Sequence, residues 1–179
     1  MSWQIGFAHT RLTFTARHMM ISKVHGEFGQ FDGTVEFDQA NPAATTIDIQ
    51  VETASLSTGT ADRDNHLKSP DFFDVENYPH MTFKSKRVDV IDDHHARLVG
   101  DLTIRDVTNE ITFDVEYLGS AKGPRGQTSV GFTATTKIKR ADWNLTWNMV
   151  LETGGVLVSE KVTINLEIEL VEVQELEKA

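Results

Sequence analysis

Two places in the sequence offer side chains that could carry acid–base chemistry. Arg63, Asp64 and His66 lie within four residues of one another, and His18 ends an earlier alternating stretch. Histidine titrates near neutral pH, so His66 or His18 could move protons on a bound substrate. The motifs typical of serine hydrolases and zinc proteases, G-x-S-x-G and H-E-x-x-H, do not occur. We expect no catalytic site, with an enzyme acting on a small hydrophobic molecule as the alternative.

Two acidic, histidine-containing stretches could bind a metal ion. Asp62, Asp64 and His66 have the spacing of the first ligands of a calcium loop, but Leu67 stands where that loop needs glycine. The run DDHH at residues 92–95 lies between alternating stretches, which is typical of a solvent-exposed hairpin turn. The chain has no cysteine, so thiolate ligands and disulfides are excluded. We expect neither a metal nor another cofactor.

The composition limits the class of partner and the number of domains. The chain has 179 residues, which predicts a single domain over residues 1–179 with a sizeable core. Its formal net charge of −10 has the wrong sign for nucleic acid. The first residues show neither a basic start nor a continuous apolar run, so we expect a cytoplasmic location. A chain trimmed of a signal peptide would read the same and would be periplasmic.

One helix is expected to position the charged group. In the stretch 58–79, Thr60 can cap a helix whose first turn carries Asp62 and Asp64, and Ser69-Pro70 ends it. The apolar residues offered by this segment are Leu67, Phe72 and Phe73. A single helix in a β-protein with apolar residues to bury suggests a plug or a lid over whatever the strands enclose.

Alternation of apolar and polar residues predicts strands through the rest of the chain. Hairpin signals at residues 92–93, 106–109 and 119–127 make neighbouring strands antiparallel. Eight long strands favour closure into an all-β, antiparallel barrel, and a sandwich remains the alternative. The predicted strands are residues 11–18, 31–38, 47–52, 81–85, 98–105, 111–117, 130–138 and 162–170.

The inward side chains of these strands are almost all apolar. A packed core explains such stripes in general. Small residues between the bulky ones would leave room for a ligand, because a barrel of this width can hold one small molecule. The small inward residues are Ala16, Gly33, Gly100 and Ala134.

Several motifs in order resemble those of the YceI-like family of polyisoprenoid-binding, lipocalin-like proteins. They are TGTADRDNHLKSPDFFDVENYP from Thr58, GDLTIRDVTNEITFDV from Gly100 and GFTATTKIKRADW from Gly131. The opening stretch 9–38 and the closing stretch 154–171 fit as well, so the resemblance spans nearly the whole chain. It implies an eight-stranded, lipocalin-like antiparallel β-barrel with one short helix near the barrel mouth.

The family's R-D-x-H-L pattern falls on Arg63, Asp64, His66 and Leu67, and its F-F pair on the two phenylalanines at 72 and 73. We interpret the charged members first as a network that pins the helix to the barrel, and second as contacts to a ligand head group. Where the family commonly has glycine, this chain has Asp106 and Asn144. Aspartate and asparagine tolerate positive φ best among the other residues, so we expect both turns to be kept. Trp143 replaces phenylalanine and is expected near the cavity mouth.

The resemblance implies binding of a long polyisoprenoid or prenyl-quinone-like lipid in the lumen, for transport, storage or sensing. It also implies a homodimer. We expect contact with a membrane only transiently, for lipid exchange, if at all. The open alternatives are an enzyme acting on an isoprenoid through His66 or His18, and a packed stress-related protein without ligand. The residues expected to contact the lipid are Phe14, His18, Phe28, Phe37, Arg63, His66, Leu67, Phe72, Phe73, Phe83, Leu102, Phe113, Phe132 and Trp143.

Overall fold

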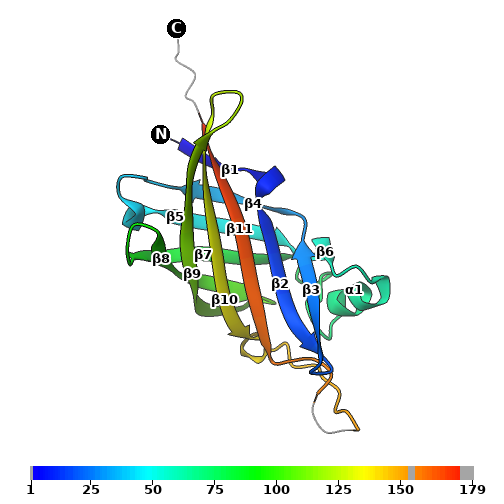
Figure 1. The fold of residues 1–179 in the computed structure, drawn as a ribbon. Helices are drawn as coiled ribbons and strands as arrows, with labels where there is room; N and C mark the ends of the chain where they lie inside the picture. Colours follow the sequence, from blue (N-terminus) through cyan, green and yellow to red (C-terminus); the bar gives the residue numbers. More distant parts are fainter. Residues whose placement is uncertain (1, 153–155, 174–179) are drawn as a thin grey trace.

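The alternating stretches form one antiparallel sheet that curls round on itself (Figure 1). The computed structural model describes residues 2–152 and 156–173. Its strands are β1 (Ser2–Ile5), β2 (Arg11–His18), β3 (Ser22–Phe28), β4 (Phe31–Glu36), β5 (Thr46–Glu52), β6 (Leu56–Ser57), β7 (His80–Val90), β8 (His95–Ile104), β9 (Val107–Lys122), β10 (Thr128–Lys139) and β11 (Lys161–Val173). The helix is α1 (Ala61–Lys68), and short 3-10 turns are η1 (Phe7–His9), η2 (Pro42–Ala44), η3 (Thr53–Ser55) and η4 (Arg140–Trp143).

The strand order shows how the sheet curls, with β4 and β6 as its two unpaired ends among the described strands. It runs β4-β5-β7-β8-β9-β10-β11-β2-β3-β6, with β1 also paired to β11. The two strands β3 and β4 are separated in sequence only by Gly29 and Gln30, yet they lie near opposite ends of this order. Hydrogen bonds from Gly29 N–H to Ser55 O (3.2 Å) and from Glu52 N–H to Gln30 O (2.9 Å) hold the corner. The predicted antiparallel barrel with one helix is confirmed, and the single sheet excludes the sandwich.

The number of strands is larger than predicted. All eight predicted stretches form strands, and β1, β3 and β6 are additional. The alternation in β3 is hidden because its inward position opposite Phe14 is Gly26. A Cβ on Gly26 would lie 2.1 Å from the Phe14 ring, so the ring occupies the space that a side chain would take. The strands β1 and β6 are short extensions, four and two residues long, below the length at which alternation is informative.

The helix begins and ends where expected, but a different residue secures its start. Thr60 is extended and its carbonyl accepts the Asp64 N–H at 2.9 Å, while its side chain makes no capping bond. Asp64 instead accepts the Thr58 N–H (2.8 Å) and the Thr58 hydroxyl (2.5 Å). At the other end, the Ser69 hydroxyl donates to His66 O at 2.6 Å. The segment is thus closed at both ends by its own side chains.

Two turns use the positive φ angles anticipated for them. Arg105 and Asp106 have φ of 51° and 62° between β8 and β9, and Asn144 has φ of 62° after η4. The predicted tolerance of these positions is confirmed. The first turn also holds the segment after the helix, because Arg105 Nη1 donates to Phe72 O at 2.8 Å. The turn between β8 and β9 and the helical segment therefore lie at the same end of the barrel.

Candidate functional site

One wall of the barrel interior is tightly packed. The inward side chains Leu98 and Leu102 of β8 and Phe113 of β9 are 5–6% exposed. Trp143 lies against this wall, 2% exposed, and its indole N–H donates to Leu102 O at 2.9 Å. Trp143 is therefore part of the core, in place of the expected position at a cavity mouth. Its ring is large enough to fill the end of the sheet where β8 and β9 turn.

Between the buried clusters of the interior, many inward apolar side chains stay half-buried. These inward residues keep accessible surface on the concave face of the sheet because no neighbouring side chain covers them completely. Packed cores leave few such gaps, so the surface they line is suited to an apolar ligand. Along β2, β4, β5 and β11 the inward positions are uncharged up to His18 at the end of β2. The half-buried lining includes Leu12, Phe14, Ile49, Met81, Phe83, Ile164, Leu166 and Ile168.

Aromatic rings connect the predicted residues into three groups. Phe14, Phe28 and Phe73 form a chain with centroid separations of 5.6 Å and 5.6 Å. Phe83 and Phe113 meet edge to face at 5.4 Å. A third group lies at the β1 end, where Phe37 contacts Phe132 at 5.4 Å and both pack near Trp3 and Tyr117. Phe31 and Ile49 pack against both the cluster at the β1 end and the cluster beside the helix, so the apolar lining is continuous between them.

The space beside the inward glycines is already filled. A Cβ on Gly100 would lie 2.5 Å from the Phe83 ring, and one on Gly33 would lie 2.7 Å from Ile49 Cδ1. The expectation that Gly33 and Gly100 leave room for a ligand is therefore corrected. These glycines let large side chains lie flat on the sheet, and the remaining accessible surface belongs to those side chains.

Apolar and charged residues of the helical segment make different contacts. Leu67 and Phe73 pack against the interior cluster around Phe28, Val51 and Leu56. Arg63 turns back along the chain, and its Nε and Nη2 donate to the hydroxyl and carbonyl of Thr58 at 2.7 Å and 2.8 Å. Arg63 and Asp64 thus both bond to Thr58, the residue that follows β6. The arrangement fixes the helix start and leaves contacts with the interior to the apolar side chains.

His66 and Phe72 form a junction with the segment that follows β10. The His66 ring lies 4.4 Å from Trp147 and 5.2 Å from Phe72, and its Nε2 is 2.9 Å from Asp71 Oδ2. Phe72 is 5% exposed and lies 5.5 Å from Trp147. The His66 ring is therefore fixed by two aromatic contacts and one hydrogen bond. We name the contact of His66, Phe72, Trp147 and Arg140 the end junction.

Arg140 and Trp147 are the residues of the end junction that were not among the expected contact residues, and Arg140 is the more deeply embedded in hydrogen bonds. It is 5% exposed, and its guanidinium donates to the carbonyls of Leu145 (2.6 Å), Trp147 (2.8 Å) and Ser159 (2.9 Å). It also lies 5.9 Å over the Phe72 ring. Burial lowers the pKa of Arg140, and the charge of Glu160 opposes that shift. Nothing near Arg140 in the sequence distinguishes it from the exposed lysines that precede it.

Side chains of both candidate metal sites form hydrogen bonds with nearby residues, Asp64 with Thr58 and His66 with Asp71 in the first site. The His94 N–H and the His95 ring bond to Asp92, which lowers the pKa of that carboxyl group. Among the described residues, no cluster of three or more histidine, aspartate or glutamate side chains is placed to hold a metal ion. Within the same residues, the helix is too short and polar to cross a membrane.

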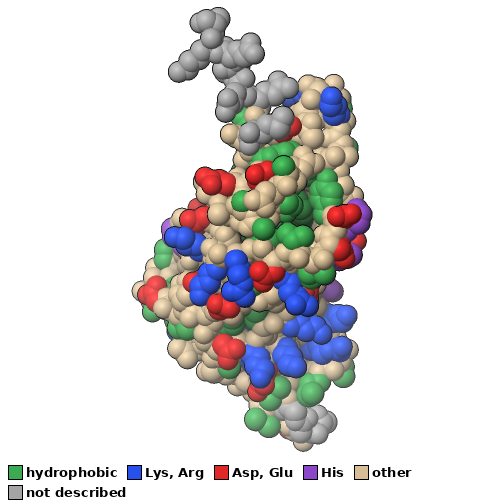
Figure 2. All heavy atoms as spheres, turned by 90° about the vertical axis from the view of Figure 1, so that its left-hand side faces the viewer, with side chains coloured by type: hydrophobic (Ala, Val, Ile, Leu, Met, Phe, Trp, Pro, Cys, Tyr) green, Lys and Arg blue, Asp and Glu red, His purple; other side chains and the backbone are tan. Residues whose placement is uncertain are grey.

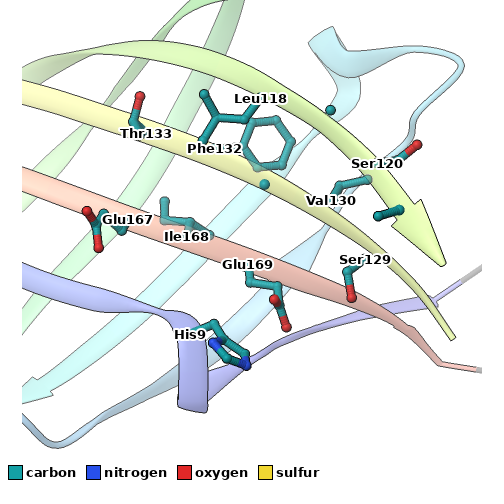
Figure 3. Close-up of a pocket in the computed structure, with 13 residues that line it drawn as sticks. His9, Leu118, Ser120, Ser129, Val130, Phe132, Thr133, Glu167, Ile168 and Glu169 are labelled. Atoms are coloured by element: carbon teal, nitrogen blue, oxygen red, sulfur yellow. The ribbon is translucent and has the colours of Figure 1, made fainter. Parts of the chain in front are cut away.

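A separate hollow of about 470 Å³ lies on the outer side of β9, β10 and β11 (Figure 3). It forms over Gly119 and Gly131, next to the irregular pairing between Gly131 and Phe132, and His9 and Glu169 lie at its side. Of the predicted contact residues, only Phe132 lines this hollow. The interior lining and the outer hollow are therefore two different surfaces.

Comparison with known proteins gives one consistent result. Residues 3–170 match the family described as the YceI-like domain. A UPF0312 protein of Staphylococcus aureus strain MSSA476 is 40% identical over 87% of this chain and 88% of its own length. The YCEI protein of Campylobacter jejuni is 35% identical, with a TM-score of 0.76 over 88% of this chain and 90% of the other.

More distant solved structures share the fold. BcnA of Burkholderia cenocepacia has a TM-score of 0.81 at 22% identity, over 93% of this chain and 99% of its own. A polyisoprenoid-binding domain of Saccharophagus degradans, implicated in plant cell wall breakdown, has a TM-score of 0.67 at 14% identity, over 97% and 99% of the two chains. The curled sheet with one helix is thus common to proteins of very different sequence.

Proposed function

This chain belongs to the YceI-like domain family, and we propose that it binds a long polyisoprenoid or prenyl-quinone-like lipid along the barrel interior. The observation that carries the proposal is the half-buried apolar lining of β2, β7 and β11, which includes Phe14, Phe83 and Leu166. The polyisoprenoid-binding domain of Saccharophagus degradans, which shares the fold, supports this class of ligand. We propose binding for transport, storage or sensing, without catalysis.

Burial of the lipid would supply the binding free energy. Apolar surface removed from water contributes about 25 cal/mol per Å², so each isoprene unit contributes on the order of a few kcal/mol before the cost of ordering the chain. The lining residues that would receive these units are already fixed by ring contacts, for example Phe14 with Phe28. A preordered lining loses little entropy on binding, and a long prenyl chain needs no polar contact to be retained.

The first experiment places a charge in the lining. Phe83→Asp should abolish lipid retention, because the carboxylate would face the interior next to Phe113. Thr112→Asp adds the same charge to an exposed position of β9 and is the matched control. Native mass spectrometry and organic extraction of the purified proteins measure bound lipid and also test for the expected homodimer. A folded Phe83→Asp protein that retains lipid as the wild type does would disprove the interior site.

The second experiment asks whether the helical segment opens for the ligand. Phe73 packs on the interior and Phe72 on the end junction, so the two positions separate lipid contact from anchoring. Phe73→Ala should speed lipid release, since most affinity changes at one site appear in the off-rate. Phe72→Ala should lower thermal stability equally with and without lipid. Hydrogen exchange over residues 61–73 that is the same in both states would leave the helix as a fixed plug.

A further inference from the structure

Two loops with exposed apolar side chains lie side by side at one end of the barrel (Figure 1). The turn between β2 and β3 is joined to the segment before β11 by a hydrogen bond from Met19 N–H to Leu157 O at 2.8 Å. Leu157 N–H in turn donates to Met149 O at 2.8 Å. Ile21 is 81% exposed and Val150 is 79% exposed. We call this surface the apolar tip and define it as Met19, Met20, Ile21, Met149 and Val150.

The turn that carries the apolar tip has an unusual sequence for its backbone. Met19 and Met20 have φ of 53° and 63°, and Ile21 N–H donates to His18 O at 3.3 Å. Positive φ at both central residues is the type I′ turn, for which Asn-Gly is favoured and other side chains are strained. Two methionines in these positions lower stability and keep their side chains in water. The two methionines at the centre of this turn are therefore not explained by a contribution to folding stability.

A row of cations lies beside the apolar tip, on the outer side of the sheet. Lys139 is paired directly with Lys161, and Arg17 directly with Lys23, at the ends of four adjacent strands. Like charges directly opposite one another are destabilising. None of these four side chains is in an ion pair among the described residues, whereas Arg11, further along β2, is paired with Glu27 at 2.8 Å. We call these four residues the basic row.

The basic row is a local exception to the acidic charge of the chain. The chain as a whole has a net charge of −10, yet basic side chains gather beside this end. Figure 2 shows Lys and Arg side chains, with Asp and Glu side chains among them, across the middle and lower part of one face, and hydrophobic side chains at its lower end. An apolar projection flanked by cations is the composition of proteins that insert into the headgroup region of anionic bilayers.

We propose that the apolar tip and the basic row dock this end of the barrel onto an anionic membrane surface. A second copy of the chain is a poorer occupant, because two basic rows would repel each other. The acidic remainder of the molecule is repelled by anionic lipid, so the surface potential would orient the protein with this end toward the bilayer. The docked end also carries the end junction, next to the helix. The apolar tip and the basic row include no residue of the interior lining, so docking does not depend on the proposed ligand.

The test is flotation of the purified protein with lipid vesicles. Binding is expected to vesicles of mixed phosphatidylcholine and phosphatidylglycerol and to weaken with added salt. Equal binding to pure phosphatidylcholine vesicles, or no binding to the mixed vesicles, would overturn the proposal. Analytical ultracentrifugation without vesicles covers the other occupant: self-association that is lost when the apolar tip is changed would also overturn it.

One double variant separates docking from folding. Met19→Asn with Met20→Gly installs the favoured residues of the turn, so thermal stability should stay the same or rise. Its affinity for the mixed vesicles should nevertheless fall by about tenfold or more, because two inserted side chains are lost. Vesicle binding equal to that of the wild type would refute the role of the apolar tip. Val90→Asn with Ile91→Gly removes two exposed apolar residues elsewhere and should leave vesicle binding unchanged.

A second double variant tests the basic row. Lys139→Gln with Lys161→Gln should weaken binding to the mixed vesicles by roughly 30-fold, since each cation near an anionic surface contributes a factor of about five. The matched control is Lys122→Gln with Arg125→Gln, which changes the net charge equally in the β9–β10 hairpin at the opposite end. Equal loss in both variants would show that only net charge matters and would overturn the proposal.

Discussion

Truncation of Phe83 and of Phe113 to alanine should separate a lining residue from a packing residue within one pair of touching rings. The rings meet edge to face at 5.4 Å, but Phe113 is 5% exposed and Phe83 is half-buried. Phe113→Ala should lower the free energy of unfolding by about 3–5 kcal/mol, as for a phenylalanine in a closed core. Phe83→Ala removes less buried surface and should cost roughly half as much, about 1.5–2.5 kcal/mol. A double-mutant cycle should give a coupling of about 0.5–1.5 kcal/mol for the ring pair.

Lipid retention should follow the opposite order. Phe83 presents accessible surface to the interior, so Phe83→Ala should lose more lipid than Phe113→Ala at a temperature where both are folded. Urea denaturation of delipidated protein measures the loss of stability in each variant. Extraction of lipid from the folded protein measures how much lipid each variant retains. If Phe83→Ala costs as much stability as Phe113→Ala and leaves bound lipid unchanged, Phe83 is an ordinary core residue and does not contact the lipid.

Three further predictions test separate parts of the structure. Gly26→Ala should destabilise the protein by about 1–3 kcal/mol, because the new Cβ would overlap the Phe14 ring, and Phe14→Leu should restore part of the loss; thermal unfolding of the single and double variants measures both. His66→Ala should lower thermal stability through the lost ring contacts with Trp147, and a prenyl-substrate reaction that disappears in this variant would move the protein to the enzymes. The Arg11 side chain donates to Glu27 and lowers the pKa of that carboxyl group. Stability from this pair is present above the unfolded pKa of glutamate and is lost as pH falls through the folded pKa. Arg11→Gln should therefore cost a little stability at neutral pH and none in strong acid, as denaturation at the two pH values would show.

Strand positions were predictable because side chains on the curled sheet alternate between water and the interior. The alternation fails where the interior position is filled from another strand. In β3 the inward residue is Gly26 under the Phe14 ring, and no local pattern reports that a ring from β2 will cover it. Turns with positive φ at Asp106 and Asn144 were predictable because the family that the sequence resembles commonly has glycine there, and aspartate and asparagine tolerate that conformation.

The candidate site was predictable in its chemistry and less so in its arrangement. Apolar inward residues could be read from alternation, but how deeply each one is buried depends on partners distant in the sequence. Trp143 is core because its indole reaches Leu102 O, and Arg140 is buried because a later segment wraps its guanidinium with carbonyls. Both environments are built by nonlocal contacts, and neither leaves a periodic signal.

The position of β11 has a consequence for how the chain folds during synthesis. This strand lies between β10 and β2 and also pairs with β1, although β1 and β2 are made first and β11 last among the described strands. Pairing between segments so distant in sequence is slow, because a long loop must close before the contacts form. Until Lys161 and the residues after it leave the ribosome, β2 and β10 each present an unpaired edge. The two parts of the sheet can therefore be joined only after β11 is made, and a nascent chain paused before β11 exposes two strand edges that invite aggregation.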